Sequence, residues 1–108
     1  MKQIPKIPRK VILLNQDIKI VSANKYCNER HILGEADVNH NSIKLCSIYD
    51  KENVPFHKQR HALFHELTHF LFFVIGQSRH SRNEMFVDNL ATAMEDLILK
   101  NNFDKTLK

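Results

Sequence analysis

The sequence holds one short pattern whose residue types and spacing could bind a metal ion. Residues 65–69 read His-Glu-Leu-Thr-His, which is an HExxH motif. On an α-helix, residues four positions apart lie on one face, so the imidazoles of His65 and His69 can reach the same ion. Zn²⁺ binds neutral imidazole well and prefers four ligands. The motif therefore predicts a zinc site on a helix.

Glu66 occupies the position that would give such a site hydrolytic chemistry. It lies about 100° round the helix from His65, which makes it a poor third ligand. It can still take a proton from a water molecule activated by zinc, since zinc lowers the pKa of its water to about 7. Glu66 is therefore the predicted general base. The competing interpretation is a core helix whose histidines are exposed or hydrogen-bonded.

Three other histidines leave alternatives open. His57 and His61 continue the four-residue spacing backwards, so His61 and His65 could chelate a metal equally well. Residue 62 is alanine, however, and that pair has no adjacent base. His57 and His61 also fall in the polar opening turns of the expected helix, where solvent exposure is expected. His80, in the connector that follows, is a reserve ligand.

A catalytic zinc needs a third protein ligand, and the best candidate is Glu84. Asp88 follows four residues later on the same helical face. It can accept the free N–H of a ligating histidine, as outer carboxylates of zinc sites usually do. The alternative for Glu84 is a capping box with Ser81, in which its side chain folds back to the helix start. The ligand role is favoured because it alone accounts for HExxH and Asp88 together.

The elements that must position these side chains follow from the hydrophobic periodicity. Apolar residues recur at helical spacing from residue 55 or 56 to residue 76, and again from about residue 85 to 101. Before them, residues 10–21 and 33–48 each predict a strand–turn–strand unit. Strands followed by two long helices indicate an α+β domain in which both helices pack on one face of a small antiparallel sheet.

Length and composition indicate a single domain. The chain has 108 residues, of which 43% are hydrophobic, as is normal for a globular protein. We expect one domain over residues 1–108, with residues 1–10 as an extended basic arm and residues 102–108 as a C-terminal tail. Two cysteines without an export signal favour free thiols and a cytoplasmic location. The longest apolar run follows two histidines and a glutamate, so no membrane span is expected.

The net charge of the chain bears on whether it binds a nucleic acid. Sixteen lysines and arginines stand against 12 acidic residues, for a net charge of +4. Much of the excess lies at the two ends of the chain, which indicates a solvated basic surface rather than a nucleic-acid stripe. No nucleic-acid partner is therefore expected. A basic nucleic-acid accessory protein is the weakest of the three functional interpretations.

HExxH followed on the next helix by E-x-x-x-D resembles the gluzincin metallopeptidases. In its compact form the chain is similar to the ImmA/IrrE-type metallopeptidases and to small metallopeptidase-like proteins of phages and integrated elements. The resemblance rests on "HALFHELTHFLF" and "EMFVDNLATAMEDLI", and "LGEADVNHNSIKL" is similar to the strand pair that precedes the helix. Together these stretches cover roughly residues 33–101.

The resemblance implies a role for each residue of the motif. His65, His69 and Glu84 would be the zinc ligands, Glu66 the general base, and Asp88 an outer partner. It further implies a phage or mobile-element protein in a bacterial host cytoplasm. The expected function is zinc-dependent hydrolysis of a peptide bond in one specific protein partner.

Substrate contacts are expected along a sheet edge beside the metal-binding helix, as is common in gluzincin-like enzymes. Main-chain hydrogen bonds would bind the extended peptide. The strand predicted to make them contains Ile43, Lys44, Leu45 and Cys46. Candidates for stabilising the oxyanion are Tyr26, Tyr49 and His80.

The alternative function is a catalytically silent zinc-binding protein that acts by binding a host or phage protein. Glu66 is the feature that speaks against it, because a purely structural site gains little from a base beside its ligand. Oligomeric state is not predicted by any feature of the sequence.

Overall fold

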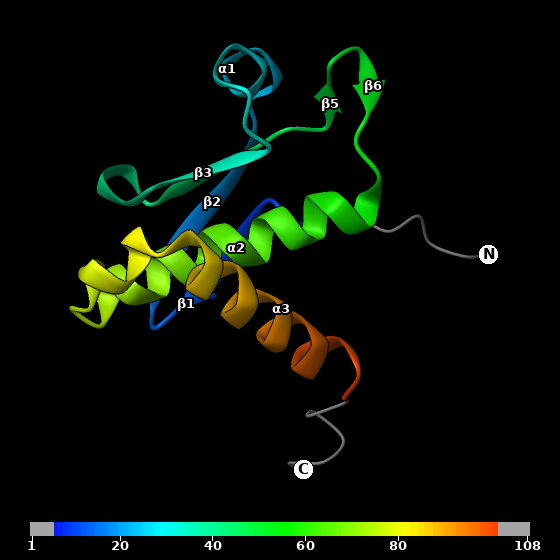
Figure 1. Ribbon diagram of the computed structural model, residues 1–108. Coiled ribbons are helices and arrows are strands. Elements are labelled where there is room, and N and C mark those ends of the chain that lie inside the picture. Colours follow the sequence, from blue (N-terminus) through cyan, green and yellow to red (C-terminus); the bar gives the residue numbers. More distant parts are fainter. Residues whose placement is uncertain (1–5, 102–108) are drawn as a thin grey trace.

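The computed structural model describes residues 6–101, in which a small sheet is followed by two packed helices (Figure 1). The elements are β1 (Lys10–Leu13), β2 (Gln16–Ser22), α1 (Asn24–Arg30), β3 (Gly34–Asp37), the 3-10 turn η1 (Val38–His40), β4 (Ser42–Leu45), β5 (Ile48–Tyr49), β6 (Glu52–Asn53), α2 (Phe56–Val74), the 3-10 turn η2 (Ser78–Arg82) and α3 (Glu84–Leu99). The predicted α+β class and the two packed helices are confirmed, but only α2 packs on the sheet, because α3 packs on α2.

The ends of the predicted domain are only partly described. Residues 1–5 of the expected arm and the expected tail 102–108 lie outside the described residues. Lys10, counted with the arm, is the first residue of β1. Arg9 also joins the sheet, because its carbonyl accepts a hydrogen bond from the Ile20 N–H at 2.9 Å. The inner end of the predicted arm is therefore part of the sheet.

The main sheet has the strand order β1-β2-β4-β3 and is mixed. β1 pairs antiparallel with β2, and β3 pairs antiparallel with β4, but β2 and β4 are parallel. The predicted small antiparallel sheet is therefore correct for two strand pairs and wrong for the pair of β2 and β4. The reason is that α1 leads from β2 to β3, which runs antiparallel to β2 at the far edge of the sheet. The turn at η1 then brings β4 back between the two strands, in the direction of β2.

The strand predicted to bind substrate is not at a sheet edge. β4 lies between β2 and β3, so Ile43 is paired with Ile20 on one side and with Ala36 on the other. The predicted substrate contacts are therefore wrong as edge contacts; these residues are Ile43, Lys44, Leu45 and Cys46. Alternation along a strand indicates which side chains share a face, but it does not give the order of strands in a sheet.

The free edge that faces the helices belongs to β3, which lies beside α2 in Figure 1. α2 covers the sheet face formed by β3 and β4. The core between them contains buried residues from the sheet and from α2, namely Ile18, Ile20, Ile43, Leu45, Leu63 and Phe70. Burying this apolar stripe is what anchors the predicted metal-binding helix to the sheet.

Both long helices begin and end close to their predicted bounds. α2 starts after Pro55, and the chain turns at Gly76, whose φ of +75° lies in the left-handed region that suits glycine after a helix. α3 packs on α2, with Val87 and Ala91 buried. Within residues 6–101, no helix combines the length and apolar character needed to cross a membrane.

Candidate metal centre

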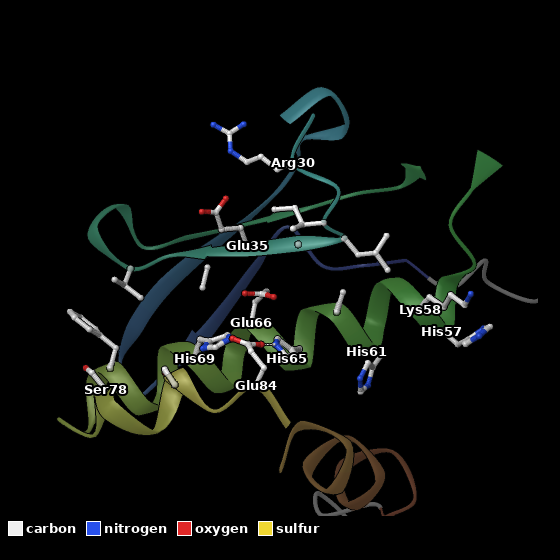
Figure 2. A pocket seen from close by; sticks show the side chains of 18 residues that line it. Arg30, Glu35, His57, Lys58, His61, His65, Glu66, His69, Ser78 and Glu84 are labelled. Carbon is white, nitrogen blue, oxygen red and sulfur yellow. Dashed lines mark hydrogen bonds and ion pairs between the residues drawn. The ribbon is translucent and has the colours of Figure 1, made fainter. Parts of the chain in front are cut away.

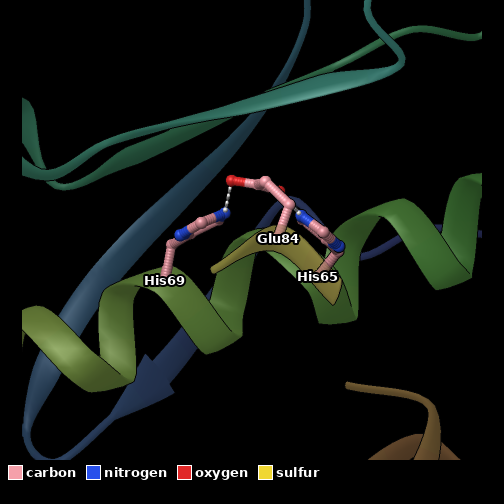
Figure 3. A group of neighbouring side chains, drawn as sticks. All are labelled: His65, His69 and Glu84. Atoms are coloured by element: carbon pink, nitrogen blue, oxygen red, sulfur yellow. Dashed lines mark hydrogen bonds and ion pairs between the residues drawn. The ribbon is translucent and has the colours of Figure 1, made fainter. Parts of the chain in front are cut away.

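Three side chains from α2 and α3 meet at one point (Figure 3). His65, His69 and Glu84 each offer one donor atom, and these atoms lie within 4.8 Å of one another. The Nε2 of His65 is 2.9 Å from Glu84 Oε2, and the Nε2 of His69 is 3.3 Å from Glu84 Oε1. Tetrahedral bonds of about 2.0–2.1 Å separate donors by roughly 3.3 Å. The group could therefore hold a metal ion with little rearrangement.

The two histidines are held by the helix that carries them. They lie one turn apart on α2, with ring centroids 5.0 Å apart and in an edge-on arrangement. Their side chains are only 19% and 18% exposed, so each ring has few alternative positions. The four-residue spacing thus does what the sequence predicted and presents both rings to one side of the helix.

Glu84 reaches the histidines because another residue caps α3. The side chain of Asn83 accepts a hydrogen bond from the Phe86 N–H at 3.1 Å, which satisfies the start of the helix. Ser81 lies in η2 and does not cap, so the alternative capping box is wrong. As the first residue of α3, Glu84 is free to point toward α2.

Glu66 lies beside the cluster, buried between α2 and β3 (Figure 2). Burial raises the pKa of its carboxyl to about 7, against the lowering effects of the His65 ring and of a hydrogen bond from the Ala36 N–H. A carboxyl group with a pKa near 7 can both accept and return a proton at neutral pH. Its position beside the cluster and its raised pKa both fit the predicted general base.

The free edge of β3 runs along the same site. The Leu33 carbonyl accepts a hydrogen bond from the Cys46 N–H at 2.9 Å, which sets the alternation of ladder bonds between β3 and β4. By that alternation the main-chain groups of Gly34 and Ala36 point toward the free edge. The hydrogen bond from the Ala36 N–H to Glu66 agrees with this direction.

Gly34 is required by its close neighbours, and we expect Gly34→Ala to destabilise the protein by about 1–3 kcal/mol. An added Cβ would lie 3.0 Å from Leu45 Cδ2, 3.1 Å from the Lys44 carbonyl oxygen and 3.4 Å from Glu66 Cγ. The Lys44 oxygen belongs to the paired strand and cannot swing aside. Urea unfolding of the metal-free protein measures the effect, and an unchanged midpoint would contradict it.

An open cleft of about 1230 Å³ lies between β3 and α2 and includes the cluster. Its lining includes Ala36 and Val38 on one side, the histidines on the other, and Ser78 near one end. Clefts that bind drug-sized ligands measure about 300–1,000 Å³, so this one has room for a longer molecule. Figure 2 shows β3 as the wall opposite Glu66.

The candidates for the oxyanion stabiliser do not line this cleft. The Tyr26 ring is covered by the Arg30 guanidinium, whose Cζ lies 3.7 Å from the centre of the ring. Tyr49 packs near the buried cysteines. His80 packs against the rings of Phe72 and Phe86 and is also outside the metal cluster, which excludes it as the reserve ligand in this arrangement.

Asp88 contacts the outer ring nitrogen of His65, as the sequence predicted for a carboxylate that supports a ligating histidine. Its Oδ1 lies 3.1 Å from Nδ1 of His65, on the side of the ring away from Glu84. The same oxygen lies 2.8 Å from Nε2 of His61. His61 therefore faces α3 and takes no part in the cluster, which decides against the rival His61–His65 pair.

Two residues in this network were not predicted from the sequence. Nδ1 of His61 lies 3.1 Å from Glu95 Oε1, and Arg60 Nε lies 2.8 Å from Glu95 Oε2. Glu84, Asp88 and Glu95 share one face of α3, at spacings of four and seven residues. That acidic stripe, opposite the histidines of α2, is the signal that could have identified Glu95.

Titration of His61 predicts a pH dependence of stability. Burial acts to lower the pKa of His61, but its bonds to Asp88 and Glu95 outweigh this and raise it. The His61 and His65 rings lower the pKa of Asp88; burial acts to raise the pKa of Glu95, but Arg60 and His61 outweigh this and lower it.

A raised histidine pKa contributes stability that is complete below about pH 6.5 and is lost as the pH rises through the folded-state value. Lowered carboxyl pKa values contribute above about pH 4 and are lost in acid. The destabilisation caused by His61→Gln in metal-free protein should therefore be largest between about pH 5 and 6 and decline at higher pH. Urea unfolding of both proteins across this range tests it, and a pH-independent difference would refute it.

Comparison with known proteins identifies no relative. No protein-family model, no curated protein and no solved structure matches the chain. Its function has to be inferred from the geometry of the cluster, the buried carboxyl group and the cleft.

Proposed function

We propose that this protein is a zinc-dependent metallopeptidase of the gluzincin type, related to the ImmA/IrrE-like enzymes. The observation that supports this most directly is the meeting of His65, His69 and Glu84 beside the buried Glu66. A metal-binding group alone would fit many roles. A buried carboxyl beside the donors, in an open cleft, is the arrangement expected of a site for metal-assisted hydrolysis.

The donor set supports zinc as the metal. It combines two imidazoles with one carboxylate, whereas Ca²⁺ and Mg²⁺ prefer oxygen ligands alone. Structural zinc sites have four protein ligands, while catalytic sites have three and leave one position open. Among the described residues no fourth histidine, cysteine or carboxylate joins the group. When bound, zinc would polarise the scissile carbonyl and increase the acidity of water.

Glu66 would carry the proton in this reaction. Its carboxylate would accept a proton from water as the water attacks the peptide carbonyl, and would return it to the leaving amine. Burial between α2 and β3, together with the Ala36 N–H, holds the side chain at a fixed position for this transfer. A cation bound at His65 and His69 would favour the charged, basic form of the group.

The substrate would be an extended segment of a protein or peptide. The outward main-chain groups of Gly34 and the outward carbonyl of Ala36 support pairing of such a segment with the edge of β3, in the manner of an added strand. The Ala36 N–H is already bound to Glu66 and would not take part. This replaces the wrong assignment of substrate contacts to β4. The volume of the cleft fits several residues of a peptide.

The test is metal-dependent cleavage of a peptide library derived from a bacterial proteome. We expect the zinc-loaded protein to release new peptide ends, identified by mass spectrometry. Chelation should stop the cleavage, and one equivalent of zinc should restore it. Absence of any zinc-dependent product would contradict the proposal.

A further inference from the structure

A chain of contacts extends from the metal cluster along the interface of α2 and α3. The two helices meet in opposite chain directions: Glu84 faces His69 and His65, Asp88 faces His65 and His61, and Glu95 faces His61. The three histidines in this chain of contacts lie four residues apart on α2. The contacts beyond Asp88 are not needed for metal ligation, so they require their own explanation.

We infer that His61 is a positioning residue, which holds Asp88 against His65 Nδ1 and is itself oriented by Glu95. The inference rests on the proposed metal site, since its consequence is the direction in which the His65 ring presents Nε2. It adds to the HExxH motif a histidine that never touches the metal.

Asp88 would be poorly fixed without His61. Its side chain is half exposed, and an exposed carboxylate on a helix surface can adopt several rotamers. One oxygen, Oδ1, lies 2.8 Å from His61 and 3.1 Å from His65, so the two rings hold it from both sides. His61 thereby removes the freedom that would let Asp88 turn toward solvent.

His61 is fixed in turn by a more buried carboxylate. The Glu95 side chain is only 12% exposed and contacts His61 Nδ1 with one oxygen and Arg60 Nε with the other. Both ring nitrogens of His61 thus face carboxylates, which favours an imidazolium that donates in both directions. Asp88 then accepts two hydrogen bonds and remains ionised.

The consequence is specific to one of the two histidines of the motif. An ionised Asp88 accepts a hydrogen bond from the Nδ1–H of His65 and favours the tautomer whose Nε2 lone pair points to the cluster. Within residues 6–101, His69 contacts the carboxylate of Glu84, and no second carboxylate lies within 4.0 Å of its ring nitrogens. Loss of His61 should therefore affect His65 and leave His69 unchanged.

Zinc affinity and a double-mutant cycle test the inference, with a competing chelator as the probe. Asp88→Asn should weaken zinc binding about 10–100-fold, and His61→Leu about tenfold, since it acts one contact further out. Because His61 acts through Asp88, adding His61→Leu to Asp88→Asn should cost less than about twofold more. His57→Leu is the matched control: His57 lies one turn earlier on α2 and is exposed.

Nitrogen NMR of the metal-free protein gives a second readout, independent of zinc and of activity. The comparison is made in the Glu84→Ala background, at a pH where the His65 ring is neutral, because Glu84 Oε2 lies 2.9 Å from His65 Nε2 and would compete for the ring proton. In that background we expect His65 to carry its proton on Nδ1, the added His61→Leu to produce a mixture of tautomers, and His69 to be the same in both. His61→Gln should give the same result with a smaller change in packing. Unfolding midpoints for each metal-free variant establish that it is folded.

Two results would overturn the inference. One is a zinc affinity in His61→Leu within twofold of the His57→Leu control. The other is a His61→Leu effect that is undiminished in the Asp88→Asn background, since His61 would then act independently of Asp88. A wild-type protein that binds no zinc would instead end the proposed function, while the NMR comparison would still decide whether His61 positions His65.

Discussion

Replacing Glu66 by glutamine is expected to reduce peptide hydrolysis by about 10²–10⁴-fold while leaving zinc binding intact. Glutamine has the size and shape of glutamate and can still accept the Ala36 hydrogen bond, so the fold and the cluster should be preserved. It cannot take a proton from water. The measurement is kcat/KM on a cleaved peptide, together with zinc content and the affinity for zinc.

Glu52→Gln provides the control, since Glu52 is an exposed residue of β6 that does not line the cleft. It should match wild type in both assays. Activity of Glu66→Gln within about threefold of wild type would mean that Glu66 is not the base. Full biological function of Glu66→Gln, with no cleavage by either protein, would favour the catalytically silent binding protein instead.

Replacing His65 by alanine should abolish stoichiometric zinc binding. The site has three protein donors, and removal of one leaves two, which hold the ion much less firmly. The loss should exceed the roughly 10–100-fold effect of removing an outer partner. Metal content of the purified proteins measures it: about one zinc per wild-type chain and close to none in the variant.

Thermal unfolding in the presence of zinc adds an independent measure of the same loss. A ligand at 100 times its Kd stabilises the folded state by about 2.7 kcal/mol, so zinc should raise the Tm of wild type but not that of His65→Ala. His57→Ala, two turns earlier on α2, should behave like wild type. If wild type holds no more zinc than His65→Ala, the chain has no zinc site at these residues.

The parts of this molecule that depend on neighbours in the sequence were predictable. α2 was expected from residue 55 or 56 to residue 76 and runs from Phe56 to Val74. The side-chain period of a helix depends on local backbone geometry, so HExxH already placed His65 and His69 on one face. Glu84 and Asp88 were identified because their spacing on the next helix matches the same rule.

Strand order and the environment of each side chain were decided by the tertiary structure. No local pattern shows that β4 lies between β2 and β3 and runs parallel to β2. This strand order leaves β3, and not β4, at the edge of the sheet. Likewise, the sequence favoured His65 and His69 over the other two histidines at the same spacing, but it did not show what His61 contacts. Contacts with α3 separate them: two meet Glu84, and His61 meets Asp88 and Glu95.

The sequence by itself thus determined the two long helices, the donors that each presents, and Glu66 beside them. These depend on the helical repeat and on which residues are apolar. Only the tertiary structure decided that the donors meet, that Glu66 is buried against β3, and that His65 and His69 face Glu84 while His61 faces Asp88 and Glu95. The physical reason is that helix geometry is a short-range property, whereas proximity and burial depend on packing between segments far apart in the chain.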